Sequence, residues 1–155
     1  MKRPAILVSA CLMGVNCRYD GGGKCVPELE ELMELAQLVP VCPEIMGGLP
    51  TPRTPSERVG DRVLMRDGTD VTQAFRRGAQ EALRLARLYG AQIAVLKERS
   101  PSCGSGTIYD GSFSGGLTAG YGVAGEMLRE NGMQICGESK IRELIETLRK
   151  DVQEG

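Results

Sequence analysis

Three of the six cysteines in this chain follow short apolar runs that are typical of buried β-strands. The runs span residues 4–10, 38–41 and 91–98, and the cysteines are Cys11, Cys42 and Cys103. In parallel sheets, ligands bind beyond the carboxyl ends of the strands, so the three thiolates could converge on one metal site. The chain has no histidine that could complete a set of four ligands. One metal position would then stay open to a substrate, as it does in catalytic metal sites.

The spacing of these cysteines also indicates which metal group they could hold. The sequence has no C-x-x-C pair, which is the local signature of zinc ribbons and of many thiol oxidoreductases. Three ligands from three distant loops fit a [4Fe-4S] cluster whose fourth iron is open, and zinc with three thiolates and a water is the alternative. The remaining cysteines have structural contexts, because Cys17 and Cys25 flank the glycine turn 21–23 and Cys136 lies within an apolar run.

Acidic and hydroxyl side chains lie next to two of the candidate ligands. Glu44 follows Cys42 by two residues at a strand end restricted by a proline, which makes it the first candidate for a general base. The segment before Cys103 contains Lys97, Glu98, Arg99, Ser100 and Ser102. These side chains could hold a substrate or move protons at the metal. In the alternative interpretation, Arg99 is a solvated loop charge, and Lys97 and Glu98 pair with each other.

Length and composition predict a single domain. A chain of 155 residues with 41% apolar residues can bury one sizeable core. With 19 basic and 20 acidic residues, it has no overall field that would attract nucleic acid or an anionic membrane. No apolar stretch approaches the ~20 residues of a membrane span. Since strand and helix patterns suffice for a core without disulfide staples, we expect a cytoplasmic protein.

The hydrophobic periodicity predicts strands that alternate with helices. Helix starts and stops are marked by Asp70 as an N-cap and by Gly90 and Gly132 as terminators. The expected helices span residues 27–36, 70–89, 123–131 and 141–152, and the expected strands span 5–10, 38–42, 62–66, 93–97, 107–109 and 133–136, with 62–66 as an edge strand and 47–60 as an irregular loop. This order is typical of a three-layer, Rossmann-like α/β domain with a mostly parallel sheet and helices on both faces.

The N-terminal segment admits a different enzyme class. Cys11 and Arg18 after a strand are similar to the phosphate loop of low-molecular-weight tyrosine phosphatases and arsenate reductases, which has the spacing C-x5-R. Here the spacing is C-x6-R, and the chain has no Asp-Pro pair to supply the usual general acid of those enzymes. The phosphatase-like interpretation therefore stays the weaker alternative.

Seven motifs in order resemble the thiouracil desulfidase family, which was long described only as a domain of unknown function. They are VSACLMG at 8–14, RYDG at 18–21, PVCPE at 40–44, GGLPTPR at 47–53, DVT at 70–72, KERSPSCG at 97–104 and IYDG at 108–111. The resemblance extends from about Ala5 to Glu138. It implies a single domain of this kind over residues 1–155.

The resemblance also implies a cofactor and a reaction. The family's [4Fe-4S] cluster is bound by three cysteines, which correspond to Cys11, Cys42 and Cys103 here, and its free iron takes the sulfur of a thiolated pyrimidine. The catalytic residues of the family correspond to Glu44, which would activate a water, and Ser100, which would relay a proton. The implied reaction is a hydrolysis of the C=S group without redox change. A non-catalytic iron–sulfur scaffold or redox sensor remains an alternative.

The expected substrate is a small thiopyrimidine or thionucleotide, such as thiouracil or 4-thiouridine monophosphate. Arg18, Lys97 and Ser102 are the predicted substrate-binding residues, and Arg99 could join the two other cations in holding a phosphate. Longer relatives that carry an added domain act on tRNA, and no such extension is recognisable in this sequence. We therefore do not expect a nucleic-acid or membrane partner.

Overall fold

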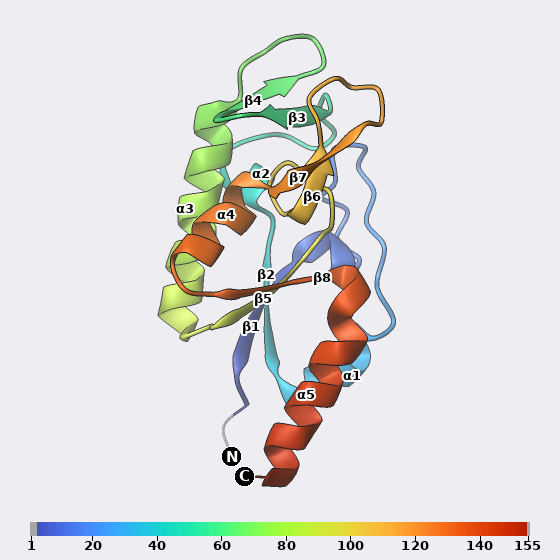
Figure 1. Ribbon diagram of the computed structural model, residues 1–155, viewed down its shortest axis with the longest axis vertical. Helices are drawn as coiled ribbons and strands as arrows, with labels where there is room; N and C mark the ends of the chain where they lie inside the picture. Colours follow the sequence, from blue (N-terminus) through green and yellow to red (C-terminus); the bar gives the residue numbers. More distant parts are fainter. Residues whose placement is uncertain (1–2, 155) are drawn as a thin grey trace.

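A four-stranded parallel sheet forms the centre of the protein (Figure 1). The computed structural model describes residues 3–154. The strands follow the spatial order β2 (Gln37–Val41), β1 (Ala5–Ser9), β5 (Ile93–Leu96) and β8 (Gln134–Gly137). Ser9 pairs with Val41 and Val8 pairs with Val95, so the carboxyl ends of the first three strands lie level with one another.

Helices cover both faces of this sheet. One apolar cluster packs Ile6 and Val8 against α1 (Leu29–Leu35) and α5 (Ile141–Glu154). A second cluster packs Leu7 on the opposite face against α3 (Thr72–Tyr89) and α4 (Val123–Glu130). Neighbouring residues of β1 thus point to opposite faces, as the pleat of a strand requires. The predicted three-layer α/β fold with a parallel sheet is confirmed.

Two antiparallel hairpins lie beyond the carboxyl ends of the parallel strands (Figure 1). One joins β3 (Ser56–Val59) to β4 (Arg62–Met65), and the other joins β6 (Ser105–Tyr109) to β7 (Leu117–Tyr121). The expected edge strand at 62–66 is present as β4, which pairs with β3 in a separate two-stranded sheet. The irregular loop expected at 47–60 was wrong at Ser56–Val59, because these residues form β3. Neither β3 nor β7 was predicted, because both are short and polar or glycine-rich.

Short helices and helix ends complete the chain. The sequence patterns did not predict the single turn α2 (Pro43–Met46) or the 3₁₀ turns η1 (Ala10–Met13) and η2 (Glu138–Lys140). The helix expected at 70–89 begins at Thr72, and the Asp70 carboxylate accepts the Thr72 backbone N–H at 2.9 Å from one position before the N-cap. Gly90 ends this helix in the left-handed region with φ +68°, as predicted.

Glycines let α2 approach α3 closely. A side-chain Cβ at Gly78 of α3 would lie 1.7 Å from the Pro43 carbonyl oxygen, and one at Gly47 would lie 1.9 Å from the Ala74 carbonyl oxygen. We expect Gly78→Ala to lower the free energy of unfolding by ~3 kcal/mol, because a clash with backbone outweighs the better helix propensity of alanine. Denaturant unfolding measures the change. The exposed Gln80→Ala on the same helix should change stability by less than ~0.5 kcal/mol, and a Gly78→Ala protein of wild-type stability would contradict the prediction.

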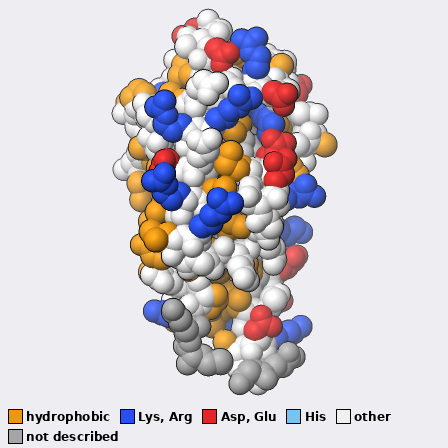
Figure 2. Space-filling view, turned by 90° about the vertical axis from the view of Figure 1, so that its left-hand side faces the viewer, with side chains coloured by type: hydrophobic (Ala, Val, Ile, Leu, Met, Phe, Trp, Pro, Cys, Tyr) orange, Lys and Arg blue, Asp and Glu red, His pale blue; other side chains and the backbone are white. Residues whose placement is uncertain are grey.

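The face of the molecule that α3 covers carries charges of both signs (Figure 2). Figure 2 faces the side that α3 covers and shows basic side chains scattered among apolar ones, with acidic side chains gathered towards one border. The exposed basic residues of α3 are Arg76, Arg77, Arg84 and Arg87. Among residues 3–154, no helix combines the length and the hydropathy needed to cross a membrane.

Candidate active site

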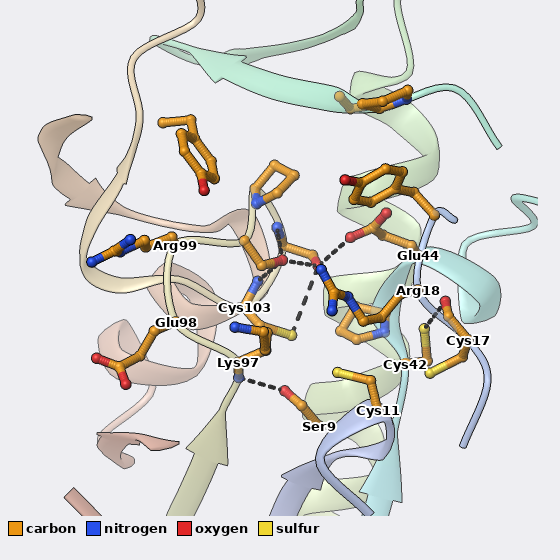
Figure 3. A pocket seen from close by; sticks show the side chains of 18 of the residues that line it. Ser9, Cys11, Cys17, Arg18, Cys42, Glu44, Lys97, Glu98, Arg99 and Cys103 are labelled. Atoms are coloured by element: carbon orange, nitrogen blue, oxygen red, sulfur yellow. Dashed lines mark hydrogen bonds between the residues drawn. The ribbon is translucent and has the colours of Figure 1, made fainter. Parts of the chain in front are cut away.

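Cys11, Cys42 and Cys103 lie at one end of the sheet (Figure 3). Cys11 is in η1 directly after β1, Cys42 lies between β2 and α2, and Cys103 is in the turn that follows β5. Since β2, β1 and β5 are neighbours, the three side chains extend from adjacent strand ends into the same cavity of about 730 Å³. The placement expected from the strand ends is present, and ligation of a metal group stays a prediction.

A fourth thiol, Cys17, lines the same cavity and is 3% exposed. Gly14 has φ +93°, and the Val15 N–H donates to the Ala10 carbonyl at 3.2 Å, so the chain turns back after η1. The Cys42 thiol donates to the Cys17 carbonyl oxygen at 3.7 Å. The sequence context had indicated a structural turn residue, and a turn of this kind brings Cys17 beside the candidate ligands. The one feature of the sequence that could have indicated this position is Gly14, a potential turn residue between Cys11 and Cys17.

The two remaining cysteines lie apart from this group. Cys25 is exposed and lines a second, smaller cavity of about 330 Å³, which Cys11 also lines. Cys136 is buried in the apolar cluster on the α1 and α5 side of the sheet. Both positions agree with the structural contexts inferred from their sequence surroundings.

Burial raises the pKa of two of the candidate ligands, Cys11 and Cys103. It raises the pKa of Cys11 to about 12, and the nearby Cys17 and Cys42 add to this effect. The pKa of Cys103 rises to about 12, although a hydrogen bond from Ser9 acts in the opposite direction. A cation bound at these sulfurs would stabilise the thiolates that burial disfavours.

Glu44 lies in the first turn of α2 and is held from two sides. Arg53 Nε donates to Glu44 Oε1 at 2.9 Å, and the two side chains are 3% and 14% exposed. Ser102 Oγ donates to Glu44 Oε2 at 2.8 Å. The carboxylate is therefore fixed at the wall of the cavity beside the cysteines (Figure 3). Arg53 ends the GGLPTPR motif at 47–53, and the sequence alone indicates no role for it.

Ser100 and Ser102 extend this hydrogen-bond chain towards Cys103. The two hydroxyl oxygens are 3.0 Å apart. Because the single proton of Ser102 is donated to Glu44, Ser100 is the donor in the contact between the serines. Ser100 Oγ in turn accepts the backbone N–H groups of Ser102 and Cys103, each at 3.1 Å. Ser102 is 2% exposed, and its hydroxyl proton is engaged by Glu44. A substrate-binding role for Ser102 stays a prediction.

Lys97, Arg18 and Arg99 all line the cavity, but they differ in exposure and in ion pairing. Lys97 Nζ forms an ion pair with Glu138 Oε1 at 2.8 Å. Glu98 accepts hydrogen bonds from the backbone and hydroxyl of Ser139, so Lys97 and Glu98 do not pair with each other as the alternative interpretation proposed. Arg18 lines both cavities, and Arg99 is exposed at the rim with φ +67°.

Aromatic side chains complete the wall opposite the sheet. Tyr109 of β6 and Phe113 of the loop between β6 and β7 line the cavity. The Arg66 guanidinium lies 5.8 Å from the centre of the Phe113 ring. The Glu57 carboxylate accepts the Phe113 backbone N–H at 3.1 Å and so anchors this loop. Apolar ring faces beside convergent polar groups are typical of sites for small planar ligands.

Comparison with known proteins places this site in a family. The model of a family described as 2-thiouracil desulfurase matches residues 6–140. The chain belongs to this family. The family membership confirms the resemblance seen in the motifs and decides against the phosphatase-like interpretation of Cys11 and Arg18.

Two individual relatives match most of the chain. The solved structure of the [4Fe-4S]-dependent thiouracil desulfidase TudS shares 46% sequence identity with a TM-score of 0.89, over 95% of this chain and 99% of that one. The uncharacterized protein YbbK of Bacillus subtilis (strain 168) is 37% identical in an alignment of 150 residues, and the match covers 90% of this chain and 99% of YbbK. The fold is therefore shared with an iron–sulfur desulfidase over nearly its whole length.

Proposed function

We propose that this protein is an iron–sulfur-dependent desulfidase that hydrolyses the C=S group of a thiolated pyrimidine to C=O and releases sulfide. The observation that carries this proposal is one cavity that holds Cys11, Cys42 and Cys103 together with the Glu44 carboxylate and its serine chain. Membership of the family and the similarity to the [4Fe-4S]-dependent desulfidase TudS support the same chemistry. The reaction consumes one water and transfers no electrons.

The donor set fits a [4Fe-4S] cluster on Cys11, Cys42 and Cys103. Soft thiolates are the ligands that such clusters take. Cys11 and Cys103 are buried, and Cys42 is half-buried. Within the described residues, no three Cys, Asp or Glu side chains are close enough to hold a single metal ion, whereas each thiolate on a cluster binds a different iron. When bound, the cluster supplies a Lewis acid for the thiocarbonyl sulfur at the iron that has no protein thiolate.

Glu44 is the general base in this proposal. Its Oε1 accepts from Arg53 and its Oε2 accepts from Ser102, so each carboxylate oxygen keeps one further lone pair for a water. The water gives its proton to Glu44 as its oxygen attacks the carbon of the C=S group. Ser102 and Ser100 form a path along which a proton can move between Glu44 and the neighbourhood of Cys103. Ser100 is the proton relay at the departing sulfur.

The cavity is large enough for a nucleotide as well as for a free base. Its volume of about 730 Å³ lies within the ~300–1,000 Å³ that is usual for ligand pockets. Tyr109 and Phe113 offer faces to a pyrimidine ring, and Arg18 and Arg99 offer positive charge at the wall and rim. We propose thiouracil and 4-thiouridine monophosphate as substrates of one small-molecule site in a cytoplasmic enzyme.

Charge removal at the cavity wall should separate these two substrates. We expect Arg18→Gln and Arg99→Gln to raise KM for 4-thiouridine monophosphate ~10-fold and to leave KM for 4-thiouracil unchanged, because only the nucleotide carries a phosphate. Sulfide-release kinetics on both compounds measure the effect. Arg77→Gln, on the exposed side of α3, is the matched control. An equal rise in KM for base and nucleotide would contradict a phosphate-binding role.

The proposed function itself is tested by anaerobic cluster reconstitution followed by sulfide release over a panel of thiopyrimidines. We expect iron and acid-labile sulfide in cluster stoichiometry, and sulfide release with formation of the oxo-pyrimidine. A reconstituted cluster that turns over no thiopyrimidine would favour the scaffold or redox-sensor alternative. If the protein bound zinc stoichiometrically and no iron, the assignment of a [4Fe-4S] cluster would be wrong.

A further inference from the structure

Arg53 uses its whole guanidinium group to join three segments of the site. Its Nε donates to Glu44 Oε1 at 2.9 Å, and its Nη2 donates to the Cys17 carbonyl oxygen at 2.9 Å. Its Nη1 donates to the Pro50 carbonyl at 3.1 Å and to Thr51 Oγ1 at 3.0 Å. The side chain is 3% exposed, so these contacts replace water that the charge would otherwise bind.

The backbone of Arg53 makes the same connection. Its N–H donates to the Tyr19 carbonyl at 2.8 Å, two residues beyond the carbonyl that accepts Nη2. The loop that carries Arg53 is thereby attached to the segment between Cys17 and Tyr19. That segment carries the fourth thiol of the cavity, and its Cys17 carbonyl also accepts the Cys42 thiol.

Glu44 needs such a support because its own element is short. The helix α2 is a single turn of four residues, so the Glu44 side chain receives little help from neighbouring turns. Ser102 binds only Oε2 and leaves rotation about the carboxylate open. The second contact, from Arg53 to Oε1, fixes the plane of the carboxylate. A lysine could neutralise the charge, but one ammonium cannot reproduce the planar fork that reaches Glu44, Thr51 and Cys17 together.

We propose that Arg53 is the positioning residue for Glu44, which it orients towards the cavity by clamping the carboxylate to the Cys17 to Tyr19 segment. This inference rests on the proposed function, in which Glu44 is the base. Arg53 acts through Glu44 and contacts neither the substrate nor the cluster thiols in this role. Loss of the clamp therefore slows the chemical step and leaves substrate binding and cluster content in place.

The test compares Arg53→Lys with a matched control, Arg58→Lys. Arg58 also forms an ion pair with a carboxylate, Glu126 at 2.7 Å, and donates to a carbonyl, that of Tyr121 at 2.7 Å, but it does not line the cavity. We expect Arg53→Lys to lower kcat for sulfide release ~10²-fold, as for a misplaced catalytic group, with KM and iron content at wild-type values. Arg58→Lys should leave kcat unchanged.

A double-mutant cycle distinguishes positioning from general damage. If Arg53 acts through Glu44, adding Arg53→Lys to Glu44→Gln should lower kcat by less than twofold further, because the base is already lost. Wild-type kcat in Arg53→Lys, a full additional ~10²-fold loss in the double variant, or a kcat loss that follows iron loss would each overturn the proposal. A coupling between Arg53 and Glu44 in thermal unfolding is measured without any substrate. This coupling would show that the clamp exists even if the enzyme released no sulfide from any thiopyrimidine. The absence of sulfide release would refute the proposed function and, with it, the catalytic use of the clamp.

Discussion

Replacement of Cys11, Cys42 or Cys103 by serine is expected to abolish both the bound iron and the release of sulfide. A serine hydroxyl is a poor ligand for iron in a cluster, and two thiols cannot hold a cluster for which three are provided. The visible iron–sulfur absorption and the activity should therefore disappear together. Iron per chain, the absorption spectrum and the sulfide-release rate, all measured anaerobically on the same samples, check this expectation.

The other three cysteines are the controls for this experiment. Cys25→Ser and Cys136→Ser should keep wild-type iron content, since one side chain is exposed outside the main cavity and the other is in the core. Cys17→Ser is the sharpest control, because Cys17 lines the cavity beside Cys42 and is still predicted not to be a ligand. Loss of iron in Cys17→Ser together with full iron in Cys11→Ser would move the third ligand from Cys11 to Cys17.

Glu44→Gln is expected to keep its cluster and to lose sulfide release by ~10²–10⁴-fold, the usual cost of removing a general base. Glutamine has the size of glutamate and can still accept the Arg53 N–H through its amide oxygen, so the loop contact persists. It cannot take a proton from water. Iron per chain and single-turnover rate, determined in parallel, separate the lost base from a lost cofactor.

Ser100→Ala tests the proton relay at the other end of the hydrogen-bond chain that begins at Glu44. We expect a smaller loss of rate than in Glu44→Gln, because Ser102 still reaches Glu44 and a water can replace one hydroxyl. The alanine also leaves the Ser102 and Cys103 backbone N–H groups without their acceptor, so iron content is measured here too. A Glu44→Gln protein with full cluster and wild-type rate would show that the base lies elsewhere.

The clamp and the serine chain together give the Glu44 carboxylate two fixed partners, Arg53 and Ser102. A base that is held in one orientation needs no rearrangement when water attacks, and this preorganisation is a large part of what an enzyme site contributes. The positive charge of Arg53 compensates the carboxylate where burial would otherwise destabilise it. The proposed roles of Arg53, Ser102 and Ser100 are therefore connected through one residue.

The sequence by itself determined the layers of the fold and the common end of the sheet at which the chemistry lies. Apolar runs such as 5–10 and 93–97 can be buried only as inner strands, and parallel strands place their carboxyl ends together. Cys11, Cys42, Cys103 and Glu44 follow such runs within a few residues. Local pattern and position along the chain were therefore enough to bring them to one site.

Only the tertiary structure decided which side chains touch one another there. The turn at Gly14 brings Cys17 beside Cys42, the loop after α2 brings Arg53 onto Glu44, and the second hairpin brings Phe113 over the cavity. These contacts join segments whose conformations are set by glycines, short turns and buried hydrogen bonds, none of which has a regular period. Periodicity reports which face of an element is buried, whereas the partner of a loop side chain depends on how distant segments pack.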